Sequence, residues 1–112
     1  MNELLNIDNL LNIDNFTNYS TSNPSRLIVV DFKASWCAPC KAIKPFLDYL
    51  KENYPNVDFY EIDIEDETKD TIVNNFDIVK LPTFLYYKNG KVCETLIGTN
   101  KSKIEELINE FL

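Results

Sequence analysis

Two cysteines separated by two residues, Cys37 and Cys40, are the side chains in this sequence best suited to chemistry. They follow an apolar run and open a segment with helical spacing, so we expect Cys37 at a helix N-terminus. Unpaired N–H groups and the helix dipole stabilise a thiolate there, which makes Cys37 the expected nucleophile. Cys40, one turn further and more buried, is expected to attack the mixed disulfide formed by Cys37 and to release the reduced substrate.

A metal site is the competing use of these thiols. The sequence has no histidine, and the third cysteine, Cys93, lies far along the chain from Cys40 without a second pair. A structural zinc site needs four ligands, so we expect no bound metal. Cys93 is expected to be a small buried residue of a strand, or an intermolecular or regulatory thiol if it is exposed.

A lone carboxyl group, Asp31, lies within the apolar run of residues 27–32. Burial of a carboxylate is costly and usually raises its pKa, so a group of this kind can pass protons. The alternative is a carboxylate at a strand end that reaches water. Further along, Pro82 precedes an apolar segment and is by itself typical of a proline at the start of a strand.

Apolar patterns predict the elements that must position these residues. The β-branched run at 27–32 is typical of a strand buried on both faces, and Asn89-Gly90 predicts a hairpin turn. Helical spacing over residues 38–53 predicts one helix, kinked at Pro45. Further strands are predicted at 57–64, 83–87 and 91–97, and helices at 67–76 and at 104–112, the last capped by Ser102 or Asn100.

The N-terminus contains one internal repeat, because residues 4–9 recur letter for letter as residues 10–15. Two copies of six residues cannot stack into a repeat array, so we interpret them as a local duplication. We expect a strand at about 10–13, a helix at about 14–20 and a frayed extension at 1–9. Residues 1–112 are then a single α/β domain with a central mixed five-stranded sheet flanked by four helices.

Length and charge narrow the possible functions. A chain of 112 residues is too short for a two-domain enzyme, and a net charge of -7 disfavours nucleic acid as a partner. Residues 58–77 hold eight acids and one base, which we interpret as a solvated surface, with docking of basic partners as the alternative. Without an apolar span or a basic N-terminal start, we expect a cytoplasmic monomer that does not bind membranes.

Two segments resemble the thioredoxin family. Residues 31–41, Asp-Phe-Lys-Ala-Ser-Trp-Cys-Ala-Pro-Cys-Lys, are similar to its active-site signature, and Leu81-Pro82-Thr83 with the turn at 88–90 is similar to the second half of the pattern. The likeness runs from about Leu10 to the C-terminus. It implies the thioredoxin fold and a protein-disulfide reductase that acts by dithiol/disulfide exchange, with Cys37 and Cys40 as its redox disulfide.

The resemblance also implies roles for other residues. Asp31 would be the proton acceptor for Cys40, and Pro82 would be cis and expose the backbone of Leu81 to an extended substrate, in the manner of strand addition. For Ile97, ordinary strand packing is the alternative. The residues that match the family's apolar contact surface are Trp36, Ala38, Pro39, Leu81, Pro82, Ile97 and Gly98.

Three residues depart from the family pattern. Ala38 replaces the commoner glycine between the cysteines, a position that tunes redox potential in this superfamily. Glu61 stands where many bacterial members have lysine, and its charge would raise the pKa of Asp31 and of the thiols. Lys33 replaces an aromatic or small residue. None of the three removes a group that the exchange needs.

No cofactor is expected, because two glycines cannot supply a dinucleotide-binding G-x-G-x-x-G. Electrons would come from a separate flavoprotein thioredoxin reductase and pass to disulfide-containing client proteins. Two alternatives remain, of which the first uses the same residues. One is a disulfide oxidase or isomerase, disfavoured by the missing export signal and by the lack of histidine between the cysteines. The other is a thioredoxin-like interaction module with dispensable thiols.

Overall fold

The computed structural model describes residues 12–112. No helix in this part of the chain is long and apolar enough to cross a membrane. The strands are β1 (Ile28–Lys33), β2 (Asp58–Asp63), β3 (Thr83–Lys88) and β4 (Lys91–Ile97). The helices are α1 (Ile13–Ser22), α2 (Ala38–Ala42), α3 (Lys44–Asn53), α4 (Asp70–Asn75), which follows the 3-10 turn η3 (Glu67–Lys69), and α5 (Lys101–Phe111).

The strands form one mixed sheet in the order β2-β1-β3-β4. β1 pairs with β2 in parallel and with β3 antiparallel, and β3 pairs with β4 antiparallel. The mixed sheet and the central place of β1 confirm the predicted architecture. Because β1 and β2 are parallel, their carboxyl ends meet at one edge of the sheet, which is where catalytic loops commonly lie in α/β folds.

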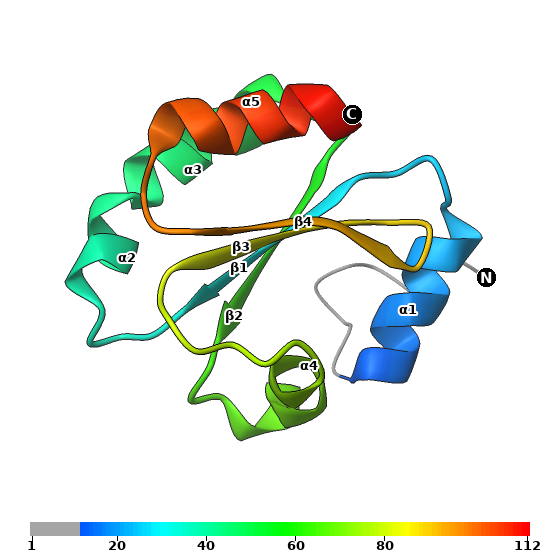
Figure 1. The fold of residues 1–112 in the computed structure, drawn as a ribbon, viewed down its shortest axis with the longest axis horizontal. Coiled ribbons are helices and arrows are strands. Elements are labelled where there is room, and N and C mark those ends of the chain that lie inside the picture. The colour runs from blue at the N-terminus through cyan, green and yellow to red at the C-terminus, as the bar shows by residue number, and fades with distance from the viewer. Residues whose placement is uncertain (1–11) are drawn as a thin grey trace.

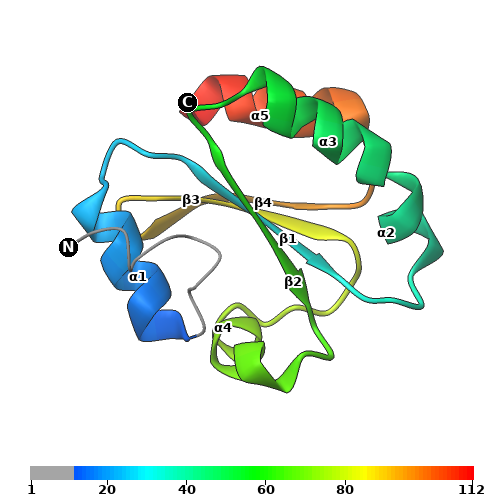
Figure 2. The ribbon, with the colours of Figure 1, turned by 180° about the vertical axis from the view of Figure 1, so that it is seen from behind.

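Alternating side chains of the sheet build two cores, one on each face. Val29 and Phe84 pack with α3 and α5, whereas Val30 and Leu85 pack with α1 and α4. Figures 1 and 2 show these two helix layers on opposite sides of the sheet. The alternation also fixes where the polar residues of β1 point: Asp31 and Lys33 follow Val29 onto the face that α3 covers.

The predicted strand at residues 10–13 is wrong for the part that the structure describes. The sheet of residues 12–112 has four strands, and Asn12 caps helix α1 by accepting a hydrogen bond from the backbone N–H of Asn15 at 2.9 Å. An asparagine at a helix N-cap satisfies one of the unpaired N–H groups of the first turn, so this segment starts a helix instead. The predicted extension at 1–9 lies outside the described residues.

The single kinked helix predicted over 38–53 is two helices. Ile43 is both the C-cap residue of α2 and the N-cap residue of α3, and Pro45 lies in the first turn of α3. A proline there loses no helical hydrogen bond, because the first N–H groups of a helix have no partner within it. The break raises the helix count of the described residues from the predicted four to five.

The hairpin prediction is confirmed. Asn89 and Gly90 both have positive φ, 50° and 73°, which is the conformation that a two-residue turn of this type needs. The backbone N–H of Gly90 donates to Ser20 Oγ at 2.8 Å, so the turn is tied to helix α1. The hairpin places β4 at the edge of the sheet, with β3 between it and β1.

Candidate active site

Cys37 and Cys40 form a disulfide at the start of helix α2, with their Cα atoms 5.3 Å apart. Cys37 is the N-cap residue, and its Sγ accepts a hydrogen bond from the backbone N–H of Cys40 at 3.3 Å. This confirms the predicted position of Cys37 at a helix N-terminus. The two residues are equally buried, at 5% exposure each, so the expectation that Cys40 is more buried is wrong.

The sulfurs are held by a tight loop that leaves β1. The backbone N–H of Cys37 donates to the carbonyl of Ala34 at 3.1 Å, which turns the chain from the strand end into α2. Trp36 projects from this loop with 64% of its surface exposed, and Ala38 and Pro39 are also exposed. The buried disulfide is therefore framed by exposed apolar side chains.

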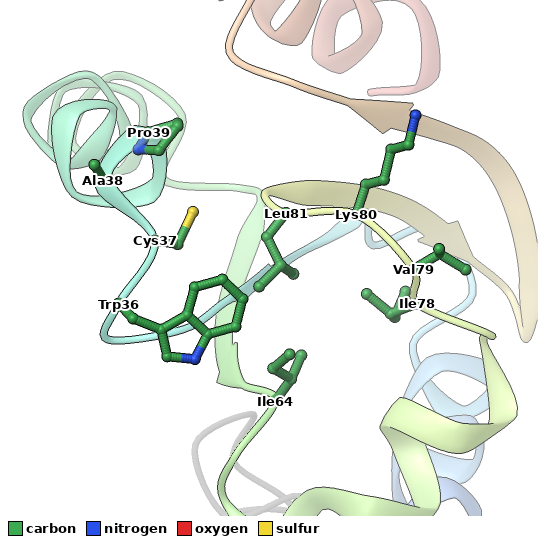
Figure 3. Close-up of a pocket in the computed structure, with 9 residues that line it drawn as sticks. All are labelled: Trp36, Cys37, Ala38, Pro39, Ile64, Ile78, Val79, Lys80 and Leu81. Carbon is green, nitrogen blue, oxygen red and sulfur yellow. The ribbon is translucent and has the colours of Figure 1, made fainter.

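On the side of Cys37 lies an open groove of about 490 Å³. Its walls come from the loop before α2 and the first turn of that helix, from the residue after β2 and from the segment before β3 (Figure 3). The Lys80 side chain extends away from the other lining residues. The lining residues are Trp36, Cys37, Ala38, Pro39, Ile64, Ile78, Val79, Lys80 and Leu81. An apolar groove beside a disulfide can receive an extended protein segment.

The peptide bond between Leu81 and Pro82 is cis, as the resemblance implies. The backbone N–H of Gly98 donates to the carbonyl of Pro82 at 3.0 Å, so the end of β4 lies beside this bond. Gly98 has a φ of +106°, which L side chains rarely adopt, and a Cβ there would meet nothing within 4 Å. Backbone conformation thus requires glycine, and the space in front of it is open.

Ile97 is 57% exposed, so its side chain is not packed into the sheet as the alternative reading would have it. It pairs with Thr83 across the hairpin, next to the cis bond. Ile97 and Gly98 do not line the groove itself, although they lie close to Pro82 through the backbone. Of the residues predicted for the contact surface, four line the groove, whereas buried Pro82 and the strand end at Ile97 and Gly98 do not.

Four residues that line the groove were not predicted from the sequence: Ile64, Ile78, Val79 and Lys80. Ile64 follows the end of β2, and the parallel pairing with β1 brings it to the same edge as the cysteines. The other three directly precede Leu81, and Val79 is 86% exposed. An apolar run next to the proline was the available signal for them, whereas nothing local marks Ile64.

Cys40 faces a different space. A cavity of about 340 Å³ on the α3 side of the sheet is lined by Cys40 together with Asp31 and charged residues of β1, β2, α2 and α3. Cys37 does not line this cavity, and Cys40 does not line the groove. The two cysteines of one disulfide therefore line different spaces, one mainly apolar and one with several charged side chains.

Asp31 is buried beneath this cavity, at 5% exposure, so the alternative of a strand-end carboxylate reaching water is wrong. Its Oδ1 finds no hydrogen-bond partner among residues 12–112. Burial, and then the negative charge of Glu61, raise the pKa of Asp31 to about 6, against the opposing charges of Lys33, Lys44 and Lys51. A carboxyl group with that pKa can take up and release protons near neutral pH.

Cys93 is half-buried on β4 and packs against the core between the sheet and helices α3 and α5. Burial raises the pKa of its thiol, against a smaller opposing effect of Lys88. A thiol is a poorer nucleophile when its thiolate is disfavoured. Cys93 therefore has the surroundings of a packing residue.

Known proteins are similar to this chain over the residues that form the fold and the site. The thioredoxin family model matches residues 9–110. Thioredoxin from Ophiophagus hannah is 46% identical over 88 residues, which cover 79% of this chain and 82% of that protein. Thioredoxin from Homo sapiens is 42% identical over 87 residues, covering 78% of this chain and 81% of the human protein.

Solved structures agree with this relationship. The X-ray structure of Fasciola hepatica thioredoxin has a TM-score of 0.82 and 31% sequence identity, and the match covers 92% of this chain and 97% of that one. A second structure concerns the thiol resolving mechanism in yeast mitochondrial 1-Cys peroxiredoxin via glutathione/thioredoxin systems. It matches with a TM-score of 0.79 and 32% identity over 90% of this chain and 92% of that one.

Proposed function

Since the chain belongs to the thioredoxin family and is a protein-disulfide reductase, we propose that Cys37 is its nucleophile and Cys40 its resolving thiol. The observation that carries this assignment is the contrast between the two sulfurs: Cys37 lines the open groove, and Cys40 lines the cavity that contains Asp31. Family membership favours this function over the oxidase or isomerase and over the interaction module.

In the first step the Cys37 thiolate attacks one sulfur of a client disulfide. A bond forms between Cys37 Sγ and that sulfur, the client disulfide breaks, and the other client sulfur leaves as a thiolate that takes a proton from water. Support for Cys37 as the attacking group comes from its N-cap position, where its Sγ accepts the N–H of Cys40. Backbone N–H groups that point at a sulfur stabilise its negative charge.

In the second step Cys40 resolves the mixed disulfide. The Cys40 thiol gives its proton to the Asp31 carboxylate, and its sulfur attacks Cys37 Sγ, so that the bond between Cys37 and the client breaks. The second client sulfur leaves as a thiolate and takes a proton from water, and Asp31 releases its proton to water. Two electrons and two protons have then passed to the client, and the disulfide between Cys37 and Cys40 is the oxidised product.

We propose the groove as the binding site for clients. Trp36, Ala38, Pro39 and Leu81 offer an apolar surface to an extended segment, and the backbone of Leu81 lies next to the cis bond to Pro82. Exposed Ile97 and the open space at Gly98 would extend this surface, and they lie outside the groove lining. Oxidised peroxiredoxin is a client worth testing, because a structural neighbour concerns peroxiredoxin resolution via glutathione/thioredoxin systems.

We also propose that a separate flavoprotein thioredoxin reductase returns the electrons, and that the chain acts as a cytoplasmic monomer. The sequence supports a separate electron donor, because its two glycines cannot form a dinucleotide-binding loop. Sedimentation of the oxidised and reduced protein tests the monomer. Reduction by NADPH with and without an added thioredoxin reductase tests the electron donor.

Replacing each cysteine by serine tests the two sulfur roles. With oxidised insulin as client, Cys40→Ser is expected to accumulate a stable mixed disulfide through Cys37, because no thiol remains to resolve it. Cys37→Ser is expected to form none and to lose turnover entirely. Non-reducing electrophoresis and mass spectrometry of the trapped peptide measure both.

Cys93→Ser is the matched control, and it should retain wild-type turnover because Cys93 lies outside the groove and the cavity. A mixed disulfide through Cys40 in the Cys37→Ser variant would reverse the assigned roles. Turnover that survives the loss of both active-site cysteines would leave the groove as a binding surface only.

A further inference from the structure

The parallel pairing of β1 and β2 brings two carboxyl groups together. Asp31 is opposite Glu61 in the register, and each lies two positions after a residue on the α3 side of the sheet, Val29 and Phe59. Like charges at adjacent positions disfavour each other, so this arrangement needs cations nearby. Both side chains line the cavity that also reaches Cys40.

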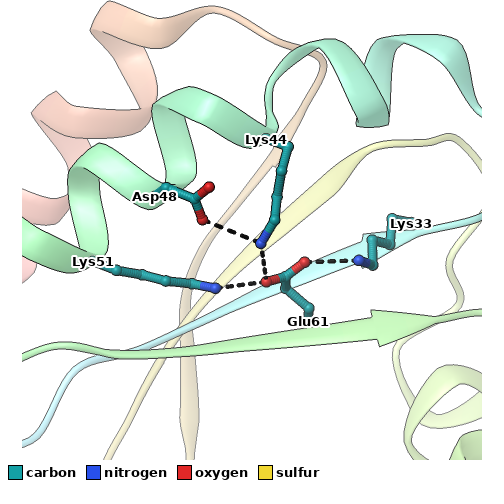
Figure 4. Close-up of polar contacts among 5 residues, drawn as sticks. All are labelled: Lys33, Lys44, Asp48, Lys51 and Glu61. Carbon is teal, nitrogen blue, oxygen red and sulfur yellow. Dashed lines mark hydrogen bonds and ion pairs between the residues drawn. The ribbon is translucent and has the colours of Figure 1, made fainter.

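The cations are present, and they are bound to Glu61. Lys33 Nζ donates to Glu61 Oε1 at 2.7 Å, while Lys44 Nζ and Lys51 Nζ donate to Oε2 at 2.9 and 2.6 Å (Figure 4). Lys44 also pairs with Asp48 at 3.2 Å. Burial alone would raise the pKa of Glu61, but the hydrogen bonds from the three lysines outweigh it and lower that pKa to about 2.

Asp31 receives none of these ammonium groups in the described part of the chain, and its Oδ1 has no hydrogen-bond partner there. On the other side of β1, the residue of β3 opposite Asp31 is Phe84, whose side chain carries no charge. The charged and titratable groups around Asp31 come from β1, α2, α3 and β2, and they are Lys33, Cys40, Lys41, Lys44, Lys51, Glu61 and Asp63. Cations therefore surround the Asp31 carboxyl group without pairing with it.

We propose that Glu61 is a positioning residue for the exchange reaction: it holds three lysines in ion pairs at the cavity, which keeps them off Asp31 and leaves that carboxyl group free to take the proton of Cys40. The inference rests on the proton-acceptor role of Asp31 in the proposed function. Glu61 lines the cavity together with Cys40, and it does not line the groove proposed for clients.

The physical reason is proton affinity. An ammonium group paired with a carboxylate lowers the carboxylate pKa by about 1 to 3 units, which makes it a weaker base toward a thiol. Proton transfer is most efficient when the acceptor's pKa lies near the working pH. Glu61 keeps the proton affinity of Asp31 high in two ways. Its negative charge raises that affinity, and its carboxylate oxygens form ion pairs with the lysines that would otherwise lower it.

Two variants with opposite expected effects test the proposal. In Glu61→Gln the pKa of Asp31 should fall by about 1 unit, because a negative charge is lost and lysines are released to pair with Asp31. In Lys51→Gln it should rise, because one cation is lost while Glu61 keeps two. The measurement is the ¹³C carboxyl titration of Asp31 in the oxidised protein, its signal identified by its absence in Asp31→Asn. The pH profile of insulin reduction should shift in the same direction as each titration.

Glu106→Gln is the matched control, because it removes the glutamate of the surface ion pair with Lys103 at 2.9 Å on α5, and it should move neither readout. A merely structural role of the cluster would let water reach Asp31 in both variants and lower its pKa in both, which would overturn the proposal. So would an unchanged titration in both. If Glu61→Gln does not fold, Lys51→Gln decides alone, and only a raised pKa supports the proposal.

Failure of the underlying function would look different. If Asp31→Asn reduces insulin at the wild-type rate across the pH range, Asp31 is not the proton acceptor, whatever its titration shows. A third outcome is that the Asp31 titration shifts in opposite directions in the two variants while the pH profile of the rate does not change. Glu61 would then set the pKa of Asp31, but its positioning role in the reaction would be overturned.

Discussion

Asp31 is a carboxyl group placed where the fold would be more stable with an uncharged residue. It is buried, one oxygen has no partner in the described residues, and its neighbour in the register is another carboxylate. Sequence predicted this burial, because a single acid interrupts an apolar run. It did not predict the lysines on Glu61, since those ion pairs join β1, β2 and α3, and no local pattern marks contacts between distant segments.

Asp31→Asn should stabilise the oxidised protein at pH 7.5. The pKa of Asp31 is about 6 when folded and 3.8 ordinarily, so the folded state binds the proton more tightly. The associated stability is therefore present below pH 3.8 and lost as the pH rises through 6. The difference of about 2 units corresponds to about 3 kcal/mol, gained by the variant at pH 7.5 and absent at pH 3. Urea unfolding at both pH values measures it.

Asp77→Asn is the matched control, because Asp77 is exposed and has a φ of 53°, which asparagine also tolerates. Its effect should stay within about 0.5 kcal/mol at either pH. An equal gain for Asp31→Asn at pH 3 and pH 7.5 would show that the asparagine packs better, and that ionisation is not the cause.

At the scale of elements, sequence patterns predicted which helices and strands exist better than where they begin and end. Helical spacing runs through Ile43 without a gap, so it could not reveal that α2 ends and α3 begins there. Apolar residues at 10–13 fit a strand equally well, yet a cap at Asn12 starts a helix. At α5, two caps were possible, and the structure uses Asn100, whose side chain accepts the N–H of Lys103 at 3.1 Å.

Asn100→Ala should therefore destabilise the protein by about 1 kcal/mol, because the first turn of α5 loses its cap and an N–H group loses its partner. The helix carries Ile104 and Leu107 into the core, so the loss is felt in global unfolding. Urea denaturation of the oxidised protein measures it. Ser102→Ala is the control expected to change little, and a larger effect there than at Asn100 would assign the cap to Ser102.

At the scale of the whole molecule, two helix layers meet the sheet through different sets of aromatic residues. Phe16 of α1 is fully buried and lies 4.7 Å from the ring of Tyr87 and 6.2 Å from those of Tyr60 and Phe76, between ring centroids. Helix α1, whose first three residues come from the second copy of the repeat, is therefore part of the core. The order of the predicted elements indicated a sheet flanked by helices, whereas Ile64 became a groove residue only through the pairing of β2 with β1.

Phe16→Ala should lower the free energy of unfolding by about 3 to 5 kcal/mol, because the three surrounding aromatic rings cannot move in to fill the cavity that it leaves. Urea unfolding of the oxidised protein measures this loss. Val79→Ala removes an apolar side chain that is 86% exposed, and it should change stability by less than about 0.5 kcal/mol. Similar effects of the two substitutions would mean that α1 is not packed as the structure has it.

Trp36 is the one tryptophan of the sequence, and it is adjacent to Cys37 in the chain and beside it at the groove. We expect the disulfide to quench the emission of this indole and its reduction to restore that emission. The protein thus carries its own optical reporter at the reacting bond. Oxidation and reduction of the disulfide can then be followed in real time, without an added label, by the fluorescence of Trp36.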